Sequence, residues 1–159
     1  MRILFVSRYN ICRSPVAEAI FRDLLESRNI SDDVEVDSAG TADDKLGQPP
    51  CTAMSSIAAA RGLALSQMQA RLVRMEDFLV FDAIYAMDGA TYQELMKITP
   101  AGEQQKVMYF LEFAPNWDTL DVPAPDNDGG GQVDAVFEIV EDGALALLQH
   151  LLRTRICPG

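Results

Sequence analysis

The sequence predicts a single α/β domain whose sheet is mainly parallel. Short apolar segments alternate along the chain with longer segments of helical periodicity, and this alternation is typical of that fold class. A length of 159 residues suits one domain, and the chain contains no internal repeat, low-complexity tract or linker. With 48% apolar and 23% charged residues, the composition is ordinary for a folded protein. We therefore expect residues 1–159 to form one three-layer domain, with helices flanking the sheet.

The first elements form the opening half of a β–α–β unit. Residues 2–6 are an apolar run, and residues 7–14 follow as a polar loop. A helical pattern begins next, with Ser14 as a suitable N-cap and Pro15 at the first helical position. The order of these segments predicts a strand, a loop and a helix.

Three further strands and four further helices complete the predicted pattern. Segments rich in Asp, Gly and Pro, at 42–50 and 113–131, predict loops. The predicted strands are 34–36, 81–86 and 107–110, and the predicted helices are 49–60, 76–78, 90–97 and 133–152.

Ligands of parallel α/β sheets bind beyond the carboxyl ends of the strands. In this chain the loops expected to converge there are 7–14, 37–41, 87–89 and 115–131. A candidate site therefore has to be built from these four segments.

Charge and hydropathy exclude several classes of function. The 24 acidic residues against 13 basic ones give a net charge of -11, which repels nucleic-acid backbones, and the basic residues are scattered. No apolar run is long enough to span a membrane. The apolar run at residues 3–6 is too short, and too soon followed by Arg8 and Arg13, for a signal peptide, so we expect a cytoplasmic protein.

Cysteine and histidine add no metal site. Cys12, Cys51 and Cys157 lack the close pairing that structural zinc requires. His150, the only histidine, lies in the last helical pattern and is expected on a helix surface without a catalytic role.

The loop at residues 7–14 carries the strongest chemical signal. Its end coincides with a helix N-terminus, where free amides and the helix dipole favour an anion. Arg13 could hold two phosphate oxygens, and Asn10 tolerates the positive φ that a tight nest of amides requires. The alternative is an ordinary strand-to-helix loop with an incidental arginine.

Three features of residues 3–21 occur in a fixed order: Asn10, the run Cys12-Arg13-Ser14-Pro15 and the run Ala17-Glu18-Ala19. With these features in this order, the segment resembles the low-molecular-weight protein tyrosine phosphatases. The family signature is a cysteine, five residues and Arg-Ser, with asparagine three places after the cysteine. The resemblance continues, in order, through residues 36–41, 47–50, 70–71, 76–78, 81–82, 87–88 and 110–111.

The resemblance implies a four-stranded parallel sheet of order 2-1-3-4 and hydrolysis of phosphotyrosine without metal or cofactor. In this family a cysteine thiolate attacks phosphorus, an arginine stabilises the equatorial oxygens, and an aspartate on a distant loop protonates the leaving tyrosine. The implied partners are a phosphotyrosine protein or a small phosphate monoester, with inorganic phosphate or sulfate as simpler ligands.

The implied roles fall on residues of the first loop. Arg13 matches the transition-state arginine, Ser14 the hydroxyl that supports the nucleophile, and Asn10 the residue that holds the loop shape; Ser38 is expected to support the loop. The expected phosphate-binding residues are Arg8, Tyr9, Asn10, Ile11, Cys12, Arg13 and Ser14.

The sequence departs from the family where the chemistry occurs. Ser7 stands at the nucleophile position, and a hydroxyl there has no neighbouring base to activate it. Ala124 stands at the general-acid position and cannot donate a proton. Asp126-Asn127 replaces the tyrosine pair that should wall the substrate ring, and Tyr9 stands where glycine is usual.

Asp126 or Asp121 could stand in as the acid, although both lie two or more residues away from its position. The alternative is that these aspartates only form a solvated acidic loop.

Tyr9 and the three cysteines are the remaining residues of interest. Tyr9 is expected at the pocket rim, as a stacking ring or a lid. Cys12 cannot pair with Ser7, so we expect it to be a packed loop thiol, and Cys51 and Cys157 to be inert.

With Ser7 and Ala124 at these two positions, we expect the chain to be catalytically silent. Two explanations are a natural pseudophosphatase and a substituted form of an active phosphatase. A different class of function also remains, a signalling adaptor that binds through another surface and retains a vestigial pocket.

Overall fold

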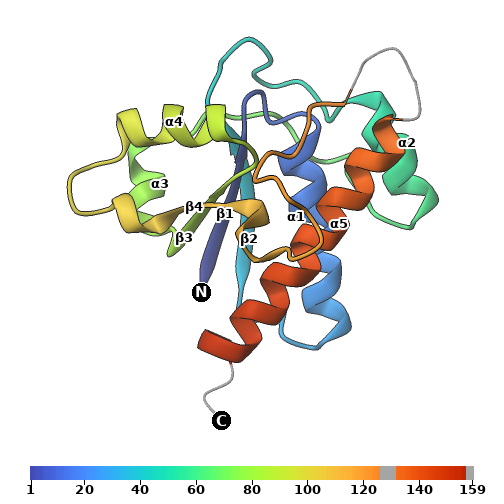
Figure 1. Ribbon diagram of the computed structural model, residues 1–159. Helices are drawn as coiled ribbons and strands as arrows, with labels where there is room; N and C mark the ends of the chain where they lie inside the picture. The colour runs from blue at the N-terminus through green and yellow to red at the C-terminus, as the bar shows by residue number, and fades with distance from the viewer. Residues whose placement is uncertain (126–131, 157–159) are drawn as a thin grey trace.

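The protein is a single α/β domain built on a four-stranded parallel sheet (Figure 1). The computed structural model describes residues 1–125 and 132–156. The strands are β1 (Arg2–Ser7), β2 (Glu35–Gly40), β3 (Ala83–Ala86) and β4 (Val107–Tyr109), in the order β2-β1-β3-β4. This order confirms the predicted 2-1-3-4 arrangement, and every strand pairing is parallel.

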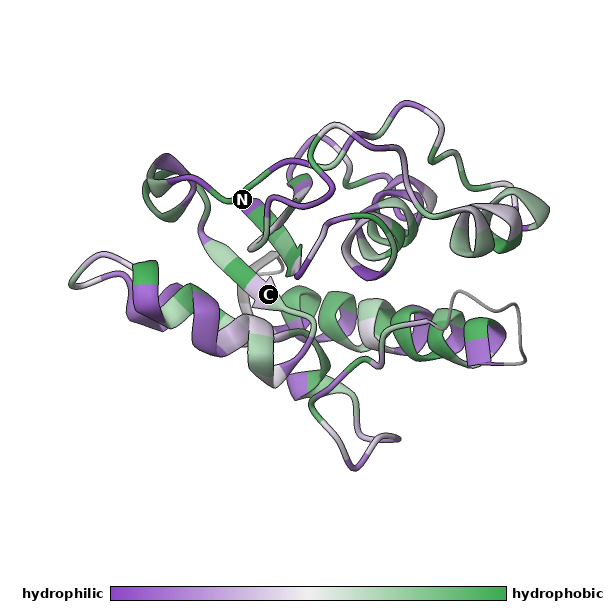
Figure 2. Ribbon diagram, turned by 90° about the horizontal axis from the view of Figure 1, so that it is seen from above, coloured by the Kyte–Doolittle hydropathy of each residue, from purple (hydrophilic) through white to green (hydrophobic). Residues whose placement is uncertain are grey.

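Helices cover both faces of the sheet. One face carries α1 (Arg13–Ser27), α2 (Thr52–Ala60) and α5 (Gln132–Leu151), and the other carries α3 (Met75–Val80) and α4 (Gly89–Ile98) (Figure 1). Figure 2 shows hydrophobic residues concentrated on the central strands and along α5. Among the described residues, no helix is both long and apolar enough to span a membrane.

The central strand β1 joins the two layers of core. Successive side chains of a strand point to opposite faces. Ile3 and Phe5 accordingly pack in the cluster that contains α1 and α5, while Leu4 and Val6 pack in the cluster that contains α3 and α4. All four are fully buried, so β1 fixes where its last residue and the following loop lie.

The start of α1 differs from the prediction. The helix begins at Arg13 with Cys12 at the N-cap position, so the expectation that Ser14 caps it is wrong. The hydroxyl of Ser14 is bonded to Ser7 and Asn10 instead, and is therefore not available to cap the helix.

The other predicted elements are present with shifted ends. β2 is longer than predicted and extends to Gly40, whereas α2 begins only at Thr52. Short 3-10 helices at Gln104–Lys106 and Phe110–Phe113, and a π-helical turn at Leu152–Ile156, were not predicted. Of the predicted loop at 113–131, residues up to 125 lie within the described structure.

The close approach of α5 to the turn after β4 depends on Gly143. A Cβ at this position would lie 2.9 Å from Leu111 Cδ2 and closer still to the ring of Phe110. Phe110 and Leu111 are both buried and cannot move aside freely.

We expect Gly143→Ala to lower the free energy of unfolding by about 1–3 kcal/mol, because the added methyl group overpacks a rigid contact. Urea unfolding of the variant and the unchanged chain measures this difference. Equal midpoints would show that α5 packs less closely than described.

Candidate functional site

The loop at residues 7–14 lies at the carboxyl edge of the sheet, between β1 and α1. β1 pairs with β2 on one side and with β3 on the other, so the chain changes direction across the sheet at this strand. Such a switch point is where open α/β sheets bind ligands. The strand register brings Ser7 beside Gly40 and places Met87, which follows β3, at the same edge.

Asn10 holds the loop in shape from inside. Its φ of 58° lies in the left-handed region, and its side chain is buried. The Nδ2 group donates to Ser14 Oγ and to Ser38 Oγ, each at 2.9 Å, while Oδ1 accepts from the backbone N–H of Arg71 at 3.1 Å. These three bonds tie the loop to α1, to β2 and to the segment before α3.

Ser38 extends the hydrogen-bond network of Asn10 to Glu18. The hydroxyl of Ser38 donates to Glu18 Oε2 at 2.6 Å, and Arg22 donates to Glu18 Oε1 at 2.6 Å. Burial raises the pKa of the Glu18 carboxyl, and the bonds from Ser38 and Arg22 offset part of that rise. Glu18 thus anchors the network on α1, a role that the sequence did not predict.

The loop turns its carbonyl groups outward. Thr41 N–H donates to the carbonyls of Ser7 and Arg8 at 3.1 Å and 3.0 Å, and Cys51 N–H donates to that of Ile11 at 2.6 Å. The backbone N–H groups of residues 8–12, in contrast, have no acceptor within the described chain. Unpaired amides grouped in one loop before a helix N-terminus form a nest for an anion.

Gly40 permits this geometry because β2 passes directly against the loop. A Cβ on Gly40 would lie 2.9 Å from the carbonyl oxygen of Arg8, 3.1 Å from the carbonyl carbon of Tyr9 and 3.2 Å from Asn10 Cβ. Only a residue without a side chain fits without displacing the loop.

Arg13 is buried at the end of the loop and is already fixed in place. Its Nη1 group donates to Asp88 Oδ2 at 2.6 Å and to the carbonyl of Val122 at 2.9 Å. The remaining donors, on Nε and Nη2, have no acceptor among the described residues. A guanidinium has five N–H donors, so three remain to bind an anion.

Asp88 fixes the position of the Arg13 guanidinium. Burial alone would raise the pKa of the Asp88 carboxyl, but hydrogen bonds from Thr91 and from Arg13 outweigh it and lower that pKa. The carboxylate is therefore ionised at neutral pH, and it also caps α4 by accepting from Thr91 N–H at 2.7 Å.

Comparison with known proteins agrees with this geometry. The family model described as "Low molecular weight phosphotyrosine protein phosphatase" matches residues 2–156. A putative low molecular weight protein-tyrosine-phosphatase of Synechocystis is 34% identical over 152 residues, which cover 95% of this chain and 96% of the relative. The Bacillus subtilis phosphatase YfkJ is 32% identical over 153 residues, covering 96% of this chain and 97% of that protein.

The chain belongs to the low molecular weight phosphotyrosine protein phosphatase family. Solved structures support this: a protein tyrosine phosphatase of Entamoeba histolytica, with Hepes in its active site, superposes with a TM-score of 0.90 at 33% identity over 98% of this chain and 99% of that one. A Drosophila arginine phosphatase superposes with a TM-score of 0.86 at 30% identity over 94% of this chain and 97% of that one.

Ser7, the residue predicted at the position of the family nucleophile, has only another hydroxyl as its side-chain partner. Ser7 is buried, and its Oγ lies 2.7 Å from Ser14 Oγ. Ser14 Oγ accepts from Nδ2 of Asn10, and the same Nδ2 group donates to Ser38 Oγ, which is bonded to Glu18. Because Nδ2 is a donor in both bonds, Asn10 cannot transfer a proton from Ser14 to Glu18. The single histidine, His150, stacks on Phe113, with ring centroids 3.7 Å apart.

The segment predicted to provide the family's acid is described as far as residue 125. Val122 holds this segment in place: its carbonyl accepts from Arg13 Nη1, and its N–H donates to the carbonyl of Met87 at 2.8 Å. Ala124 is exposed. The carboxylate of Asp121 accepts from Gly89 N–H at 2.7 Å, so it serves as an anchor of this segment.

Asp126, which we also considered as the acid, lies outside the described residues, as does its neighbour Asn127. Its role therefore stays a prediction from sequence.

The outer part of the loop carries Arg8 and Tyr9. The Arg8 guanidinium lies over the Tyr9 ring, 5.2 Å from its centroid, and the ring is half-buried. This cation–π contact favours a settled position for the tyrosine. The two roles expected for Tyr9, a stacking ring and a lid, stay predictions from sequence.

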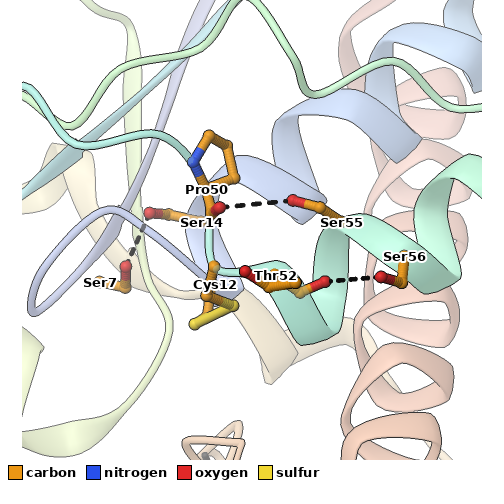
Figure 3. Close-up of a disulfide and its surroundings, with 8 residues drawn as sticks. Ser7, Cys12, Ser14, Pro50, Thr52, Ser55 and Ser56 are labelled. Carbon is orange, nitrogen blue, oxygen red and sulfur yellow. Dashed lines mark hydrogen bonds between the residues drawn. A yellow bond between two sulfur atoms is a disulfide. The ribbon is translucent and has the colours of Figure 1, made fainter.

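Two expectations about cysteine were wrong. Cys12 is not a free packed thiol and Cys51 is not inert, because the two form a disulfide with Cα atoms 5.3 Å apart (Figure 3). The two cysteines stand 39 positions apart in sequence, so the sequence did not indicate their proximity, which arises because α2 begins beside the loop. Cys157 lies outside the described residues.

A separate cavity of about 570 Å³ lies behind the loop, and Asn10 and Ser38 contribute to its lining. Its wall includes the carboxylates of Glu18, Asp37 and Glu26. The wall also includes Asp23 and two arginines, Arg22 and Arg71, which form ion pairs with Glu18 and Asp37. The acidic groups outnumber the basic ones, which disfavours a phosphate there.

We expect Gly40→Ala to loosen the loop, because the new methyl group displaces the backbone of Arg8 and Tyr9. Hydrogen–deuterium exchange of the amides of residues 8–12 should accelerate by about tenfold or more, since a contact below 3.0 Å must open. Gly143→Ala is the matched control: it also costs stability but lies away from the loop. Unchanged exchange at residues 8–12 in Gly40→Ala would contradict the close approach of β2.

Proposed function

We propose that this chain binds phosphate monoesters, phosphotyrosine among them, in the 7–14 loop and hydrolyses them extremely slowly, as a pseudophosphatase of its family. The observation that carries the proposal is the pairing of an intact anion nest with a nucleophile position that has neither a thiol nor a base. The nest consists of the unpaired amides of residues 8–12 and the free donors of Arg13.

Each lost group removes a distinct part of the family's reaction. Without a thiolate at residue 7, no phosphocysteine forms, and an unactivated hydroxyl is a poor nucleophile. Without an acid at residue 124, the phenolate leaves unprotonated, and general acid catalysis is typically worth ~10²–10⁴-fold. Binding requires neither group, so it is retained.

We favour natural loss of activity over substitution of an active phosphatase. Substitution to trap a substrate would change Ser7 and Ala124 alone, whereas Tyr9 and the pair Asp126-Asn127 also depart from the family pattern. The partner that we propose is a phosphotyrosine protein or a small phosphate monoester in the cytoplasm, bound by one domain spanning residues 1–159.

Inorganic phosphate tests the binding step directly. We expect calorimetry to detect binding to the unchanged chain, and Arg13→Ala to weaken it by roughly 10–100-fold, because a charge-assisted pair of hydrogen bonds is lost. Arg13→Lys keeps the positive charge and the contact with Asp88 but loses the two parallel N–H donors of the guanidinium. We therefore expect this variant to bind phosphate more weakly as well.

Arg28→Ala is the matched control, because it removes the same charge from an exposed site after α1. If Arg13→Ala and Arg28→Ala bind phosphate equally, the nest is not the site. The adaptor that uses another surface would then be the better account.

Restoring the missing groups tests the catalytic half of the proposal. The unchanged chain should show no burst and negligible turnover of an aryl phosphate. Ser7→Cys should cleave an aryl phosphate with a good leaving group, because the amides and Arg13 lower the pKa of a thiol placed there. Phosphotyrosine should lag until Ala124→Asp is added.

The outcomes of this series separate three accounts. Activity of the double variant on both substrates would show that the catalytic geometry persists, which favours recent loss or substitution. Inactivity of the double variant, with phosphate binding retained, would show that Tyr9 and the 126–127 pair have reshaped the pocket. Efficient phosphotyrosine cleavage by Ser7→Cys alone would overturn our placement of the acid and point to Asp126.

A further inference from the structure

We propose that Cys12 and Cys51 are a reversible dithiol–disulfide pair that sets the mobility of the 7–14 loop. The affinity of the loop for an anion then decreases when a thiol reductant opens the disulfide. The anion-binding part of this inference rests on the proposed function. The cysteine chemistry and the loop mobility rest on the structure alone.

The disulfide joins the phosphate-binding loop to a second structural element. Cys12 is the last loop residue before α1, and Cys51 is the residue before α2. Their Cα atoms are 5.3 Å apart, within the usual range for a disulfide, and Figure 3 shows the sulfur–sulfur bond at Cys12, on the loop that carries Ser7 and Ser14. The bond therefore connects the loop to the start of a helix from the next part of the chain.

The bond reinforces the end of the loop that Asn10 does not hold. Asn10 fastens the middle of the loop through its side chain. At the following residue, the Ile11 carbonyl accepts from Cys51 N–H at 2.6 Å. In the oxidised chain this hydrogen bond and the disulfide act together on Ile11 and Cys12. In the reduced chain the hydrogen bond alone remains, so the amides of residues 8–12 become less ordered.

The surroundings of the two sulfurs suit exchange. Both cysteines are half-buried, so an attacking thiolate has access to them. Each lies at the N-terminus of a helix, α1 of 15 residues and α2 of 9 residues, and Arg13 follows Cys12. A helix N-terminus favours the negative charge of the thiolate that leaves during exchange. Ser7 has no sulfur, so it cannot compete with Cys51 for Cys12.

The reaction takes up two electrons from a dithiol. One thiolate of the reductant attacks a sulfur of the pair, forms a mixed disulfide and releases the other cysteine as a thiolate, which takes up a proton. The second thiol of the reductant then displaces the first cysteine, leaving Cys12 and Cys51 as thiols and the reductant as its own disulfide. A small-molecule disulfide, such as oxidised glutathione, reverses these steps.

The test compares the oxidised chain with the chain reduced by dithiothreitol. The chain has three cysteines, so alkylation and mass spectrometry should count one free thiol in the oxidised form and three in the reduced form. Inorganic phosphate should bind the oxidised form at least about threefold more tightly, because a preorganised site loses less entropy on binding. Amide exchange at residues 8–12 should be slower in the oxidised form.

Two single variants locate the effect. Cys51→Ser should bind phosphate like the reduced chain in both conditions, whereas Cys157→Ser should keep the full response. Equal phosphate affinity and equal exchange at residues 8–12 in the two redox states would overturn the inference, as would three free thiols before reduction. If neither state binds phosphate, the proposed function fails, and exchange at residues 8–12 alone then decides whether the pair controls the loop.

Discussion

The carboxamide of Asn10 is the constraint on which the site depends. It sits in a left-handed backbone conformation, and all three of its hydrogen bonds go to neighbouring protein groups: Ser14, Ser38 and the N–H of Arg71. Holding this one residue turns the loop so that its amides face away from the protein's own acceptors. The same bonds stop any proton relay, because both hydrogens of Nδ2 are already donated. The interaction that shapes the loop therefore also separates Ser7 and Ser14 from the carboxylate of Glu18.

The rest of the architecture supports that arrangement. The central position of β1 fixes where the loop begins, and Gly40 lets β2 approach the loop backbone. Asp88, the residue before α4, holds Arg13 in place. The anion site that we propose is compatible with a net charge of -11, because the loop amides and the free donors of Arg13 act at short range, whereas solvent and salt screen the exposed carboxylates.

The sequence predicted the fold and the position of the loop well, because both follow from periodicity and from short-range order. It missed side-chain roles that depend on contacts formed only in the folded chain. Ser14 looked like a helix cap, but its hydroxyl is used within the loop. Glu18 and Asp88 carried no local signal of their roles, since their partners come from β2 and from the first loop. Cys51 was taken as inert for the same reason.

The central claim is that the loop still binds a phosphate-like anion although its nucleophile is gone. Titration of the ¹⁵N-labelled chain with inorganic phosphate, followed by NMR, tests it most directly. We predict that the amide resonances of residues 8–14 shift most and saturate together, because phosphate oxygens accept from those N–H groups. Resonances that stay unmoved at residues 8–14 in the folded chain, or larger shifts at the cavity behind the loop, would contradict the account.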